Sequence, residues 1–390
     1  MNSELATPRT PVLASRLPEV GTTIFSVMSA LAQKHGAVNL GQGFPDFDCD
    51  PGLVDAVTAA MRAGHNQYPP MPGVPALRQA LSAKIERQYG HRYDPDTEVT
   101  ITAGATQGIL TAVLAFVHPG DDVIVLEPCY DSYGPAITLA GGRVVRVPLD
   151  PASFRIDFDR LAAALSPRTR AIIVNTPHNP TGTAWPADDR RRLAELLRPT
   201  DVLVLSDEVY EHMVFDGAPH ASVSGDAELA ARSLVISSFG KTYHVTGWKV
   251  GHVAAPAPLM AEFRKVHQFN VFTVNTPMQH GLAAWLAEPA RYLELPAFYQ
   301  RKRDRFRAGL AGMRFDLLPC AGSYFQCVDY SRISDLPDQA FCEWLTAEVG
   351  VAAIPLSAFY AQAPQRPLVR FCFAKTDATL DEALRRLARL

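Results

Sequence analysis

Polar and small residues follow each of five short apolar runs between residues 99 and 242. The segments that end these runs are 103–108 (AGATQG), 127–130 (EPCY), 175–182 (NTPHNPTG), 207–210 (DEVY) and 237–242 (SSFGKT). Strands buried on both faces of a parallel sheet have such unbroken apolar sequences, and ligands bind beyond their carboxyl ends. We therefore expect an amide, a carboxylate, two phenols, hydroxyl groups and an amine to meet at one edge of a sheet.

Each of these segments has a simpler interpretation when it is taken alone. Residues 179–182 contain turn formers, and Asp207 stands where helix caps are common. Tyr130 and Tyr210 could lie at the edge of the core with solvated hydroxyl groups. Lys241 could be a surface lysine. Their common position after successive strands favours a shared site over separate coincidences.

Three familiar motifs fail on spacing. Residues 240–242 (GKT) resemble the end of a phosphate-binding P-loop, but Val235 occupies the position of its leading glycine. Residues 104–108 lack the GxGxxG spacing of a dinucleotide site. Residues 46–57 (DFDCDPGLVDAV) begin like a calcium loop, but Pro51 replaces its turn glycine and a valine replaces its last acid. The spacing therefore argues against a P-loop and a dinucleotide motif, and the sequence predicts no metal site.

The elements that position these segments follow an α/β pattern. From residue 99 to 253, β-branched apolar runs alternate with longer stretches rich in Ala, Leu and Arg, which is typical of a parallel sheet with crossover helices. We predict a large domain over 49–281, with a mostly parallel sheet between helices, and a smaller α+β domain made from the N-terminal segment 1–48 and the C-terminal part 282–390. The predicted strands are 99–102, 122–126, 171–175, 202–206, 234–237 and 250–254.

The composition is that of a globular protein with a small-molecule ligand. The 390 residues are 47% hydrophobic and 20% charged, and the formal net charge of -3 provides no basic field for nucleic acid or anionic lipid. The six cysteines form no CxxC pair, so neither a zinc site nor a disulfide framework is expected. Residues 1–16 lack a signal-peptide core, and no segment has the apolar length of a membrane span. We therefore predict a cytoplasmic protein with no nucleic-acid or membrane partner.

The polar groups at the predicted sheet edge match the requirements of pyridoxal 5′-phosphate. This cofactor needs a lysine imine, an acid at its ring nitrogen, donors to its phenolic oxygen, an aromatic stack and an anion cup. Lys241 would anchor it as a Schiff base and, once released, act as general base, while Asp207 would keep the ring nitrogen protonated. The other predicted contacts are Asn179 and Tyr210 to the phenolic oxygen, Tyr130 to the ring face, and Ala105, Thr106, Ser238 and Lys249 to the phosphate.

The chain resembles fold-type I aminotransferases of class I and II over essentially its whole length. The resemblance lies in 179–182 (NPTG), 206–210 (SDEVY), 237–242 (SSFGKT) and 247–251 (GWKVG). Within that family the chain is most similar to the methionine aminotransferase and kynurenine aminotransferase group, through 39–46 (NLGQGFPD), 66–68 (NQY) and 369–373 (VRFCF). The resemblance implies a pyridoxal-phosphate-dependent transferase with that fold.

The resemblance also implies substrate contacts and a homodimer. In the family an arginine near the C-terminus binds the substrate α-carboxylate, and Arg370 has the matching position. An arginine in the apolar strand 368–373 needs an anionic partner, and the alternative is an ion pair within the protein. The active site of the family lies at the interface of a homodimer, so Tyr68 would reach the phosphate bound by the neighbouring subunit. The other implied substrate contacts are Asn179, Gly43, Phe25 and Phe272.

The resemblance and the residues together predict an enzyme that transfers the amino group of an L-amino acid to a 2-oxo acid by a ping-pong mechanism. The apolar character of Phe25 and Phe272 favours a methionine-like or aromatic side chain over a second carboxylate. Thr273 stands where kynurenine-using relatives commonly have a histidine, which argues against kynurenine as the main substrate. The alternatives are a cysteine-S-conjugate β-lyase with the same site and, more remotely, a non-enzymatic cofactor-sensing regulator.

Overall fold

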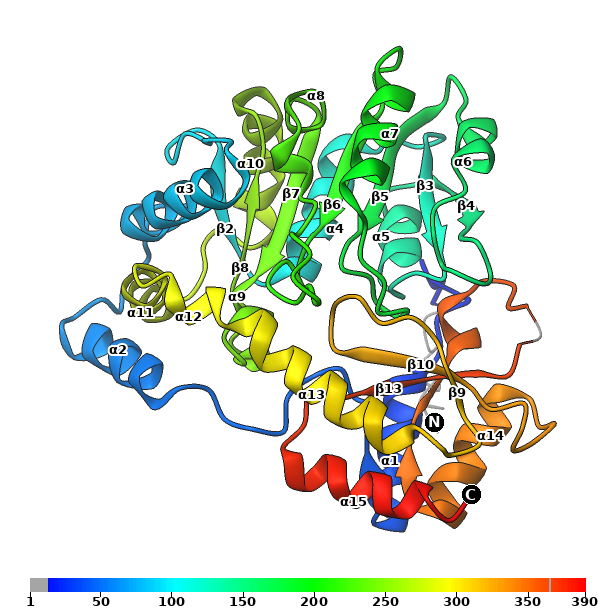
Figure 1. Cartoon of the computed structure of the whole chain (residues 1–390). Coiled ribbons are helices and arrows are strands. Elements are labelled where there is room, and N and C mark those ends of the chain that lie inside the picture. Colours follow the sequence, from blue (N-terminus) through cyan, green and yellow to red (C-terminus); the bar gives the residue numbers. More distant parts are fainter. Residues whose placement is uncertain (1–12, 365) are drawn as a thin grey trace, which may run out of the picture.

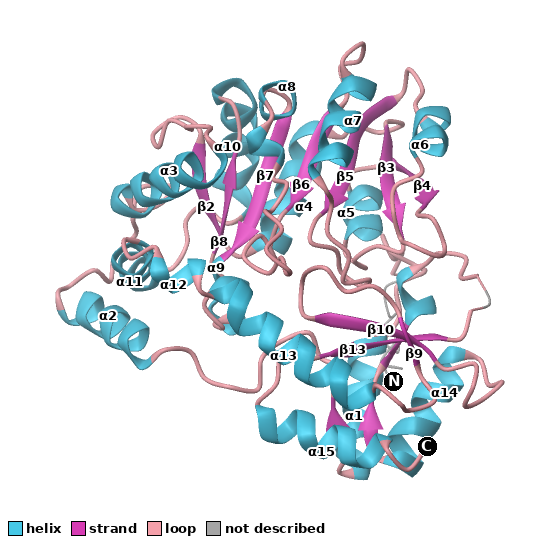
Figure 2. Ribbon diagram, viewed as in Figure 1, coloured by secondary structure: helices cyan, strands magenta, loops and turns pink. Residues whose placement is uncertain are grey.

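The computed structural model describes residues 13–364 and 366–390, which form a large α/β unit and a smaller α+β unit (Figure 1, Figure 2). The large unit contains a seven-stranded sheet in which six strands are parallel and one is antiparallel to both of its neighbours. The predicted α/β class with a mostly parallel sheet is therefore confirmed. In spatial order the strands are β2 (Val99–Thr102), the antiparallel β8 (Gly251–Ala254), β7 (Ser233–Ser238), β6 (Leu203–Asp207), β5 (Thr169–Asn175), β3 (Asp122–Glu127) and β4 (Arg143–Pro148).

The unbroken apolar runs arise because both faces of the sheet are covered. Every residue of β2 and β3 is buried. Successive side chains of β3 alternate between two apolar clusters, with Val123 on one face and Ile124 on the other. The apolar-run pattern does not predict β4, because Arg143 and Arg146 interrupt it at the exposed edge of the sheet.

Helices form a layer on each face of this sheet (Figure 2). One apolar cluster joins the sheet to α4 (Ala105–Phe116), α5 (Tyr133–Leu139) and α10 (Ala257–Asn270). The other cluster includes α3 (Pro75–Tyr89), α6 (Phe158–Ala164) and α7 (Ala187–Leu197). Helix α2 (Pro51–Arg62) packs along α11 (Thr276–Leu286) through a close contact between Val57 and Gly281. The shorter elements are η1 (Val223–Gly225), α8 (Ala227–Ala230), α9 (Phe239–Thr242), η2 (Thr246–Trp248) and α12 (Ala290–Leu293).

The smaller unit contains a four-stranded antiparallel sheet. Its strands, in spatial order, are β12 (Ile354–Pro355), β13 (Leu368–Cys372), β10 (Phe325–Asp329) and β9 (Asp316–Leu317). A parallel pair, β1 (Val38–Asn39) with β11 (Val351–Ala352), joins the N-terminal segment to the C-terminal part of the chain. The predicted boundaries after residues 48 and 281 stay predictions. The helices of this unit are α1 (Ile24–His35), α13 (Leu295–Leu310), α14 (Asp338–Trp344), η3 (Leu345–Val349), η4 (Leu356–Phe359) and α15 (Asp377–Leu387).

Two further features concern the described part of the chain as a whole. None of its helices combines the length and the apolar character needed to cross a membrane. Within residues 13–364 and 366–390 there is also no group of three His, Cys, Asp or Glu side chains that could hold a metal ion. Of the predicted N-terminal segment, residues 1–12 lie outside the described residues, and the cytoplasmic location stays a prediction.

Candidate active site

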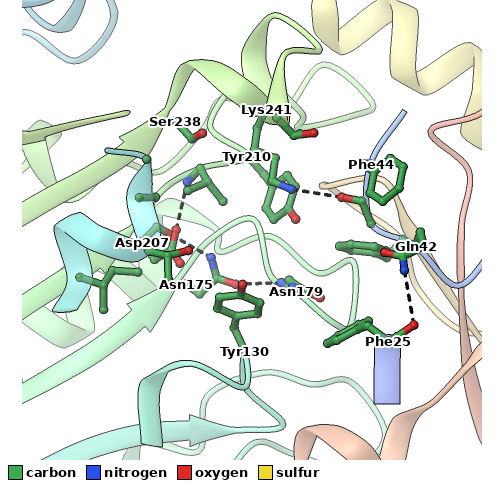
Figure 3. A pocket seen from close by; sticks show the side chains of 18 of the residues that line it. Phe25, Gln42, Phe44, Tyr130, Asn175, Asn179, Asp207, Tyr210, Ser238 and Lys241 are labelled. Atoms are coloured by element: carbon green, nitrogen blue, oxygen red, sulfur yellow. Dashed lines mark hydrogen bonds between the residues drawn. The ribbon is translucent and has the colours of Figure 1, made fainter. Parts of the chain in front are cut away.

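A cavity of about 350 Å³ lies where β5, β6 and β7 end at the carboxyl edge of the large sheet. The N-terminus of α4, the loop 42–44, α1, β10 and β13 also line it, so both units contribute. Figure 3 shows Phe25, Gln42 and Phe44 at the cavity. Two predicted site residues, Tyr68 and Phe272, are not among its lining residues. The predicted residues that line it are Phe25, Gly43, Ala105, Thr106, Tyr130, Asn179, Asp207, Tyr210, Ser238, Lys241, Lys249 and Arg370.

Lys241 lies in α9, directly after β7, and its amine points into the cavity (Figure 3). Its Nζ donates to the backbone oxygen of Gly43 over 3.1 Å and to the hydroxyl of Tyr324 over 2.9 Å. Burial lowers the pKa of the ammonium from 10.5 to about 8, because lost hydration outweighs the attraction of nearby negative groups. At pH 7 about a tenth of such amines are neutral, against roughly 0.03% for an exposed lysine. The amine can therefore act as a nucleophile or base near neutral pH.

Asp207 ends β6 and is 5% exposed. One of its carboxylate oxygens accepts a hydrogen bond from the Tyr133 hydroxyl over 2.7 Å, and the other accepts from the Val209 N–H over 3.3 Å. Burial raises the pKa of this carboxyl to about 6, although both donors oppose that change. A cationic group beside Asp207 would stabilise its ionised form, so the site favours a positively charged ligand atom at this point.

Phenol rings enter the cavity from two elements. Tyr130 follows β3 and Tyr210 follows β6, and both rings line the cavity (Figure 3). Tyr210 makes edge-to-face contacts with Tyr324 and Phe325 at centroid distances of 5.0 and 5.9 Å, which fix its ring. Burial raises the pKa of both Tyr130 and Tyr210, so their hydroxyls keep their protons near neutral pH and can donate hydrogen bonds.

One end of the cavity has the properties of an anion site. Helix α4 begins after Gly104, whose φ of 79° lies in the left-handed region that glycine favours. The first N–H groups of a helix have no intrahelical acceptor, so those of Ala105 and Thr106 face the cavity with positive partial charge. The Nζ of Lys249 lies 3.3 Å from the place that a Cβ of Gly104 would take. Among the described residues, no carboxylate lies within 4.0 Å of Lys249.

Arg370 of β13 is 1% exposed, and its guanidinium lies 3.9 Å from the ring centre of Phe325 and 4.9 Å from that of Phe359. Its terminal nitrogens donate to the side-chain oxygen of Asn179 over 2.6 Å and to the backbone oxygen of Gly41 over 3.0 Å. In the described part of the chain, Nε has no partner and no carboxylate lies within 4.0 Å. This geometry argues against an internal ion pair and favours an incoming carboxylate.

Tyr68 and Phe272 lie next to each other at the protein surface. Their ring centroids are 5.3 Å apart in an edge-to-face arrangement. Tyr68 is 80% exposed and Phe272 is 44% exposed. Within one chain, neither residue reaches the cavity that the other predicted residues line.

Several residues that the sequence analysis does not single out also build the site. The side chain of Asn175, at the end of β5, donates to the backbone oxygen of Asp207 over 2.9 Å and accepts from the N–H of Asn179 over 2.8 Å. Asn175 ends an apolar run, so the rule that found the other residues could have found it. Tyr133 and Tyr324 hold predicted residues by hydrogen bonds, but no local pattern marks them. The remaining lining residues are Gln42, Phe44, Gly104, Ile109, Val209, Thr246 and Phe325.

Comparisons of the sequence with known proteins match aminotransferases. The model of the family described as aminotransferase class I and II matches residues 35–387. The chain is 52% identical over 377 residues to methionine aminotransferase of Escherichia coli K12, with 96% of this chain and 98% of that protein covered. It is 36% identical over 394 residues to kynurenine-oxoglutarate transaminase 1 of Homo sapiens, with 91% and 93% covered.

Comparisons with solved structures agree. A crystal structure from Escherichia coli that identifies a methionine aminotransferase function matches with a TM-score of 0.96 at 52% identity, and covers 98% of this chain and 100% of that chain. The structure of N-succinyldiaminopimelate aminotransferase from Mycobacterium tuberculosis matches with a TM-score of 0.93 at 44% identity, with 97% and 100% covered. The family resemblance inferred from the sequence motifs is confirmed.

Proposed function

Because the chain belongs to the class I and II aminotransferases, we propose that it transfers the amino group of methionine or an aromatic L-amino acid to a 2-oxo acid by a ping-pong mechanism. The family makes it a pyridoxal-phosphate-dependent transferase. The observation that carries the proposal is the convergence of Lys241, Asp207 and Arg370 on one cavity. The matched relatives are aminotransferases, which favours transamination over β-elimination and over a non-enzymatic sensor.

The donor groups of the cavity fit pyridoxal phosphate. The free N–H groups at the start of α4 suit its phosphate, and so does Lys249, which has no carboxylate within 4.0 Å among the described residues. The buried carboxylate of Asp207, with its raised pKa, suits a protonated ring nitrogen. The ring of Tyr130 suits the face of the cofactor ring. The protonated phenol of Tyr210 and the amide of Asn179 suit its phenolic oxygen. Each of these groups would hold one part of the cofactor.

The residues of the chain then have separate tasks in the reaction. Bound at this site, pyridoxal phosphate supplies an electron sink for the negative charge that develops on the substrate Cα. Arg370 binds the α-carboxylate through its guanidinium donors, and this orients the amino acid. Its buried Nε has no other hydrogen-bond partner among the described residues. In the first half-reaction the neutral amine of Lys241 would take the proton from the substrate Cα and, as an ammonium, give it to the cofactor carbon C4′. In the second half-reaction the amine would move a proton in the opposite direction, from C4′ to Cα.

The cavity also favours one class of substrate side chain. Phe25 and Phe44 contribute apolar rings to its wall. Among the lining residues the cations are Lys241, Lys249 and Arg370, and the proposal assigns these to proton transfer, phosphate and α-carboxylate. A second substrate carboxylate would therefore lack a cationic partner in this chain, whereas a thioether or an aromatic ring would gain apolar contact.

The proposed enzyme is a homodimer. Tyr68 and Phe272 are exposed, and Phe269 of α10, three positions before Phe272 in the sequence, is 87% exposed. Exposed aromatic groups of this size mark interaction surfaces. In the dimer, Tyr68 would contact the phosphate bound in the cavity of the partner subunit. The expected result is twice the chain mass in light scattering after size-exclusion chromatography, with dissociation of a Tyr68→Ala and Phe269→Ala double variant.

The proposed function is tested with a panel of amino donors. The protein loaded with pyridoxal phosphate is mixed with methionine, phenylalanine or aspartate in the absence of a 2-oxo acid, and the visible absorbance of the cofactor is followed. Methionine and phenylalanine should convert the cofactor at least about 100-fold more efficiently than aspartate, because an unpaired buried carboxylate costs about 3 kcal/mol or more. Equal conversion by aspartate would contradict the proposed substrate class.

A lysine variant tests the catalytic assignment. Lys241→Ala should lose the half-reaction with methionine by about 1,000-fold or more, because removal of a general base costs about 100- to 10,000-fold. The matched control is Lys265→Ala, since Lys265 is an exposed lysine of α10 paired with Glu262. Wild-type turnover by Lys241→Ala would refute the assignment, and pyruvate and ammonia released from a cysteine conjugate without a 2-oxo acid would favour the lyase.

A further inference from the structure

Tyr324 contacts the amine of Lys241 from the opposite unit of the protein. Its hydroxyl accepts a hydrogen bond from Nζ over 2.9 Å and donates its own hydrogen to the backbone oxygen of Gly43 over 2.5 Å. Nζ also donates to the same Gly43 oxygen over 3.1 Å. One amine, one hydroxyl and one carbonyl therefore form a closed triangle of hydrogen bonds between α9, the residue before β10 and the loop 42–44.

The direction of these bonds is fixed by chemistry. Burial holds the pKa of the Tyr324 hydroxyl well above its usual range, so the hydroxyl keeps its single hydrogen. Because that hydrogen is donated to Gly43, the hydroxyl oxygen can only accept from Lys241. A neutral lysine amine has two N–H groups, and this triangle uses both of them. The lone pair of the nitrogen must then point away from the two oxygens.

The backbone around Tyr324 holds its hydroxyl in place. The side chain is 0% exposed, and its backbone oxygen accepts from the N–H of Phe373 over 3.0 Å. The preceding Ser323 donates its N–H to Met213 of the large unit over 2.8 Å. A Cβ at Gly322 would lie 2.8 Å from the Met213 oxygen, so the segment approaches the large unit as closely as the backbone allows. The hydroxyl is therefore a fixed reference point for the flexible lysine.

We propose that Tyr324 is a positioning residue for Lys241: it accepts one amine N–H, Gly43 accepts the other, and the lone pair of the amine is thereby turned toward the cavity for proton transfer at the substrate Cα. This inference rests on the proposed function, in which Lys241 is the base. It assigns to Tyr324 no proton transfer of its own and no contact with substrate. A base that is free to rotate would spend much of its time with its lone pair turned elsewhere, so orientation raises the rate of the step.

The test compares Tyr324→Phe with Tyr299→Phe. Both changes remove one buried hydroxyl and keep the ring; the Tyr299 hydroxyl has no partner in the described part of the chain, and its ring lies 5.8 Å from that of Tyr324. In single-turnover reactions with methionine, Tyr324→Phe should slow the half-reaction about tenfold with KM changed less than about twofold, because the loss lies in the proton-transfer step. The isotope effect with Cα-deuterated methionine should rise. Tyr299→Phe should match the wild type in all three quantities.

A second readout does not depend on turnover. Only the neutral amine of Lys241 captures pyridoxal phosphate, so the capture rate of the cofactor-free protein rises with pH. The Tyr324 oxygen accepts from the ammonium and favours it, so Tyr324→Phe should move this profile about one pH unit lower. Borohydride reduction and peptide mass analysis verify that the cofactor joins Lys241.

The outcomes distinguish a failure of the role proposed for Tyr324 from a failure of the proposed function. Reducible attachment of the cofactor to wild-type Lys241, with a slowed half-reaction and a shifted profile only in Tyr324→Phe, supports the role of Tyr324. The same attachment with wild-type rate, isotope effect and profile in Tyr324→Phe overturns that role and leaves the proposed function intact. Equal losses in Tyr324→Phe and Tyr299→Phe also overturn it. Absence of attachment at wild-type Lys241 overturns the proposed function and this inference together.

Discussion

Arg370 donates a terminal N–H group to the side-chain oxygen of Asn179 over 2.6 Å, which joins β13 to the segment after β5. This bond fixes the orientation of the amide, because its oxygen must face the arginine. Its NH2 group has no partner among the described residues and can donate to a ligand in the cavity. The residue predicted to bind the substrate carboxylate and the residue predicted to bind the phenolic oxygen of the cofactor therefore hold each other in place.

Replacement of Arg370 by alanine should weaken substrate binding without loss of cofactor. The change removes a buried guanidinium that lines the cavity and whose Nε has no hydrogen-bond partner among the described residues. Since hydrogen bonds between charged groups contribute about 3 kcal/mol, KM for methionine should rise about 100-fold. Cofactor content, measured by absorbance after gel filtration, should match that of Arg305→Ala, a control that breaks an exposed ion pair with Asp381. Loss of cofactor from Arg370→Ala alone would indicate a structural role instead.

Replacement of Asp207 by asparagine should stabilise the cofactor-free protein at pH 8 but not at pH 4. Folding raises the pKa of Asp207 from 3.8 to about 6, so the folded chain holds this proton more tightly than the unfolded chain. The stability that the proton provides is present below about pH 4 and is lost as pH rises through 6. The difference in pKa corresponds to about 3 kcal/mol. Tm measured at the two pH values checks the expectation.

The same variant should be a poor enzyme. Asparagine cannot pair with a cationic ring nitrogen as a carboxylate does, so the half-reaction with methionine should fall about 100-fold or more. The control is Asp188→Asn, because Asp188 is an exposed acid of α7 whose side chain is 56% exposed. A Tm gain at pH 8 in both variants, or full activity in Asp207→Asn, would contradict the assignment of Asp207.

Replacement of Gly251 by alanine should weaken binding of the cofactor through its phosphate. A Cβ at Gly251 would lie 2.7 Å from the Ser237 oxygen and 3.0 Å from the Ala105 nitrogen, so β8 approaches the start of α4 at a distance that only glycine allows. Overpacking of this kind costs about 1 to 3 kcal/mol and would displace the N–H groups of α4. Fluorescence titration should show Kd for pyridoxal phosphate raised about tenfold or more, with a smaller change for pyridoxal, which has no phosphate.

The control for this change lies four residues earlier in the same segment. A Cβ at Gly247 would meet no atom within 4 Å, so Gly247→Ala should leave both Kd values unchanged. An equal rise for pyridoxal and pyridoxal phosphate in Gly251→Ala would show a general disturbance of the cavity and contradict a specific effect on the phosphate.

The sequence predicts which residues end the strands better than which residues support them. Asp207 and Lys241 are predictable because each lies in a short segment that follows an apolar run, and the ends of neighbouring parallel strands meet. Tyr133 lies 74 positions before Asp207, and Tyr324 lies 83 positions after Lys241. No periodicity or turn signal marks either tyrosine, since their contacts exist only when distant elements pack together.

In the fold, too, the sequence predicts the positions of strands but not the features that depend on contacts between distant elements. The predicted strand 202–206 is displaced by one residue from the observed β6, Leu203–Asp207, which is the usual uncertainty at strand ends. The apolar-run pattern does not predict that β8 is antiparallel to β2 and β7, because a strand covered on both faces is apolar in either direction. The aromatic pair Tyr68 and Phe272 has a meaning only in an assembly, so one chain shows it as exposed surface.

Replacement of Lys84 by methionine should lower the unfolding free energy, because Lys84 neutralises a buried carboxylate next to the end of β7. Lys84 forms a 2.7 Å ion pair with Glu211, and the two side chains are only 4% and 5% exposed. Glu211 also accepts from the hydroxyls of Tyr89 and Ser237 over 2.6 and 2.8 Å, and Ser237 directly precedes the cavity residue Ser238. Removal of one partner leaves a buried carboxylate without a cation, which costs about 3 to 5 kcal/mol of unfolding free energy.

The loss should depend on pH and should be recoverable. Burial alone would raise the pKa of Glu211. In the wild type, Lys84 and neighbouring histidines have the larger opposite effect, so the pKa lies well below 4.5. Without Lys84, burial dominates and the folded pKa lies above the unfolded value, so the variant loses stability as pH rises through that pKa. Urea unfolding should therefore show a larger deficit at pH 8 than at pH 5, and a second change, Glu211→Gln, should recover most of the loss at pH 8. Lys265→Met, which breaks an exposed pair, should cost less than about 1 kcal/mol. A Lys84→Met deficit as small as that of Lys265→Met would refute the role of this buried pair.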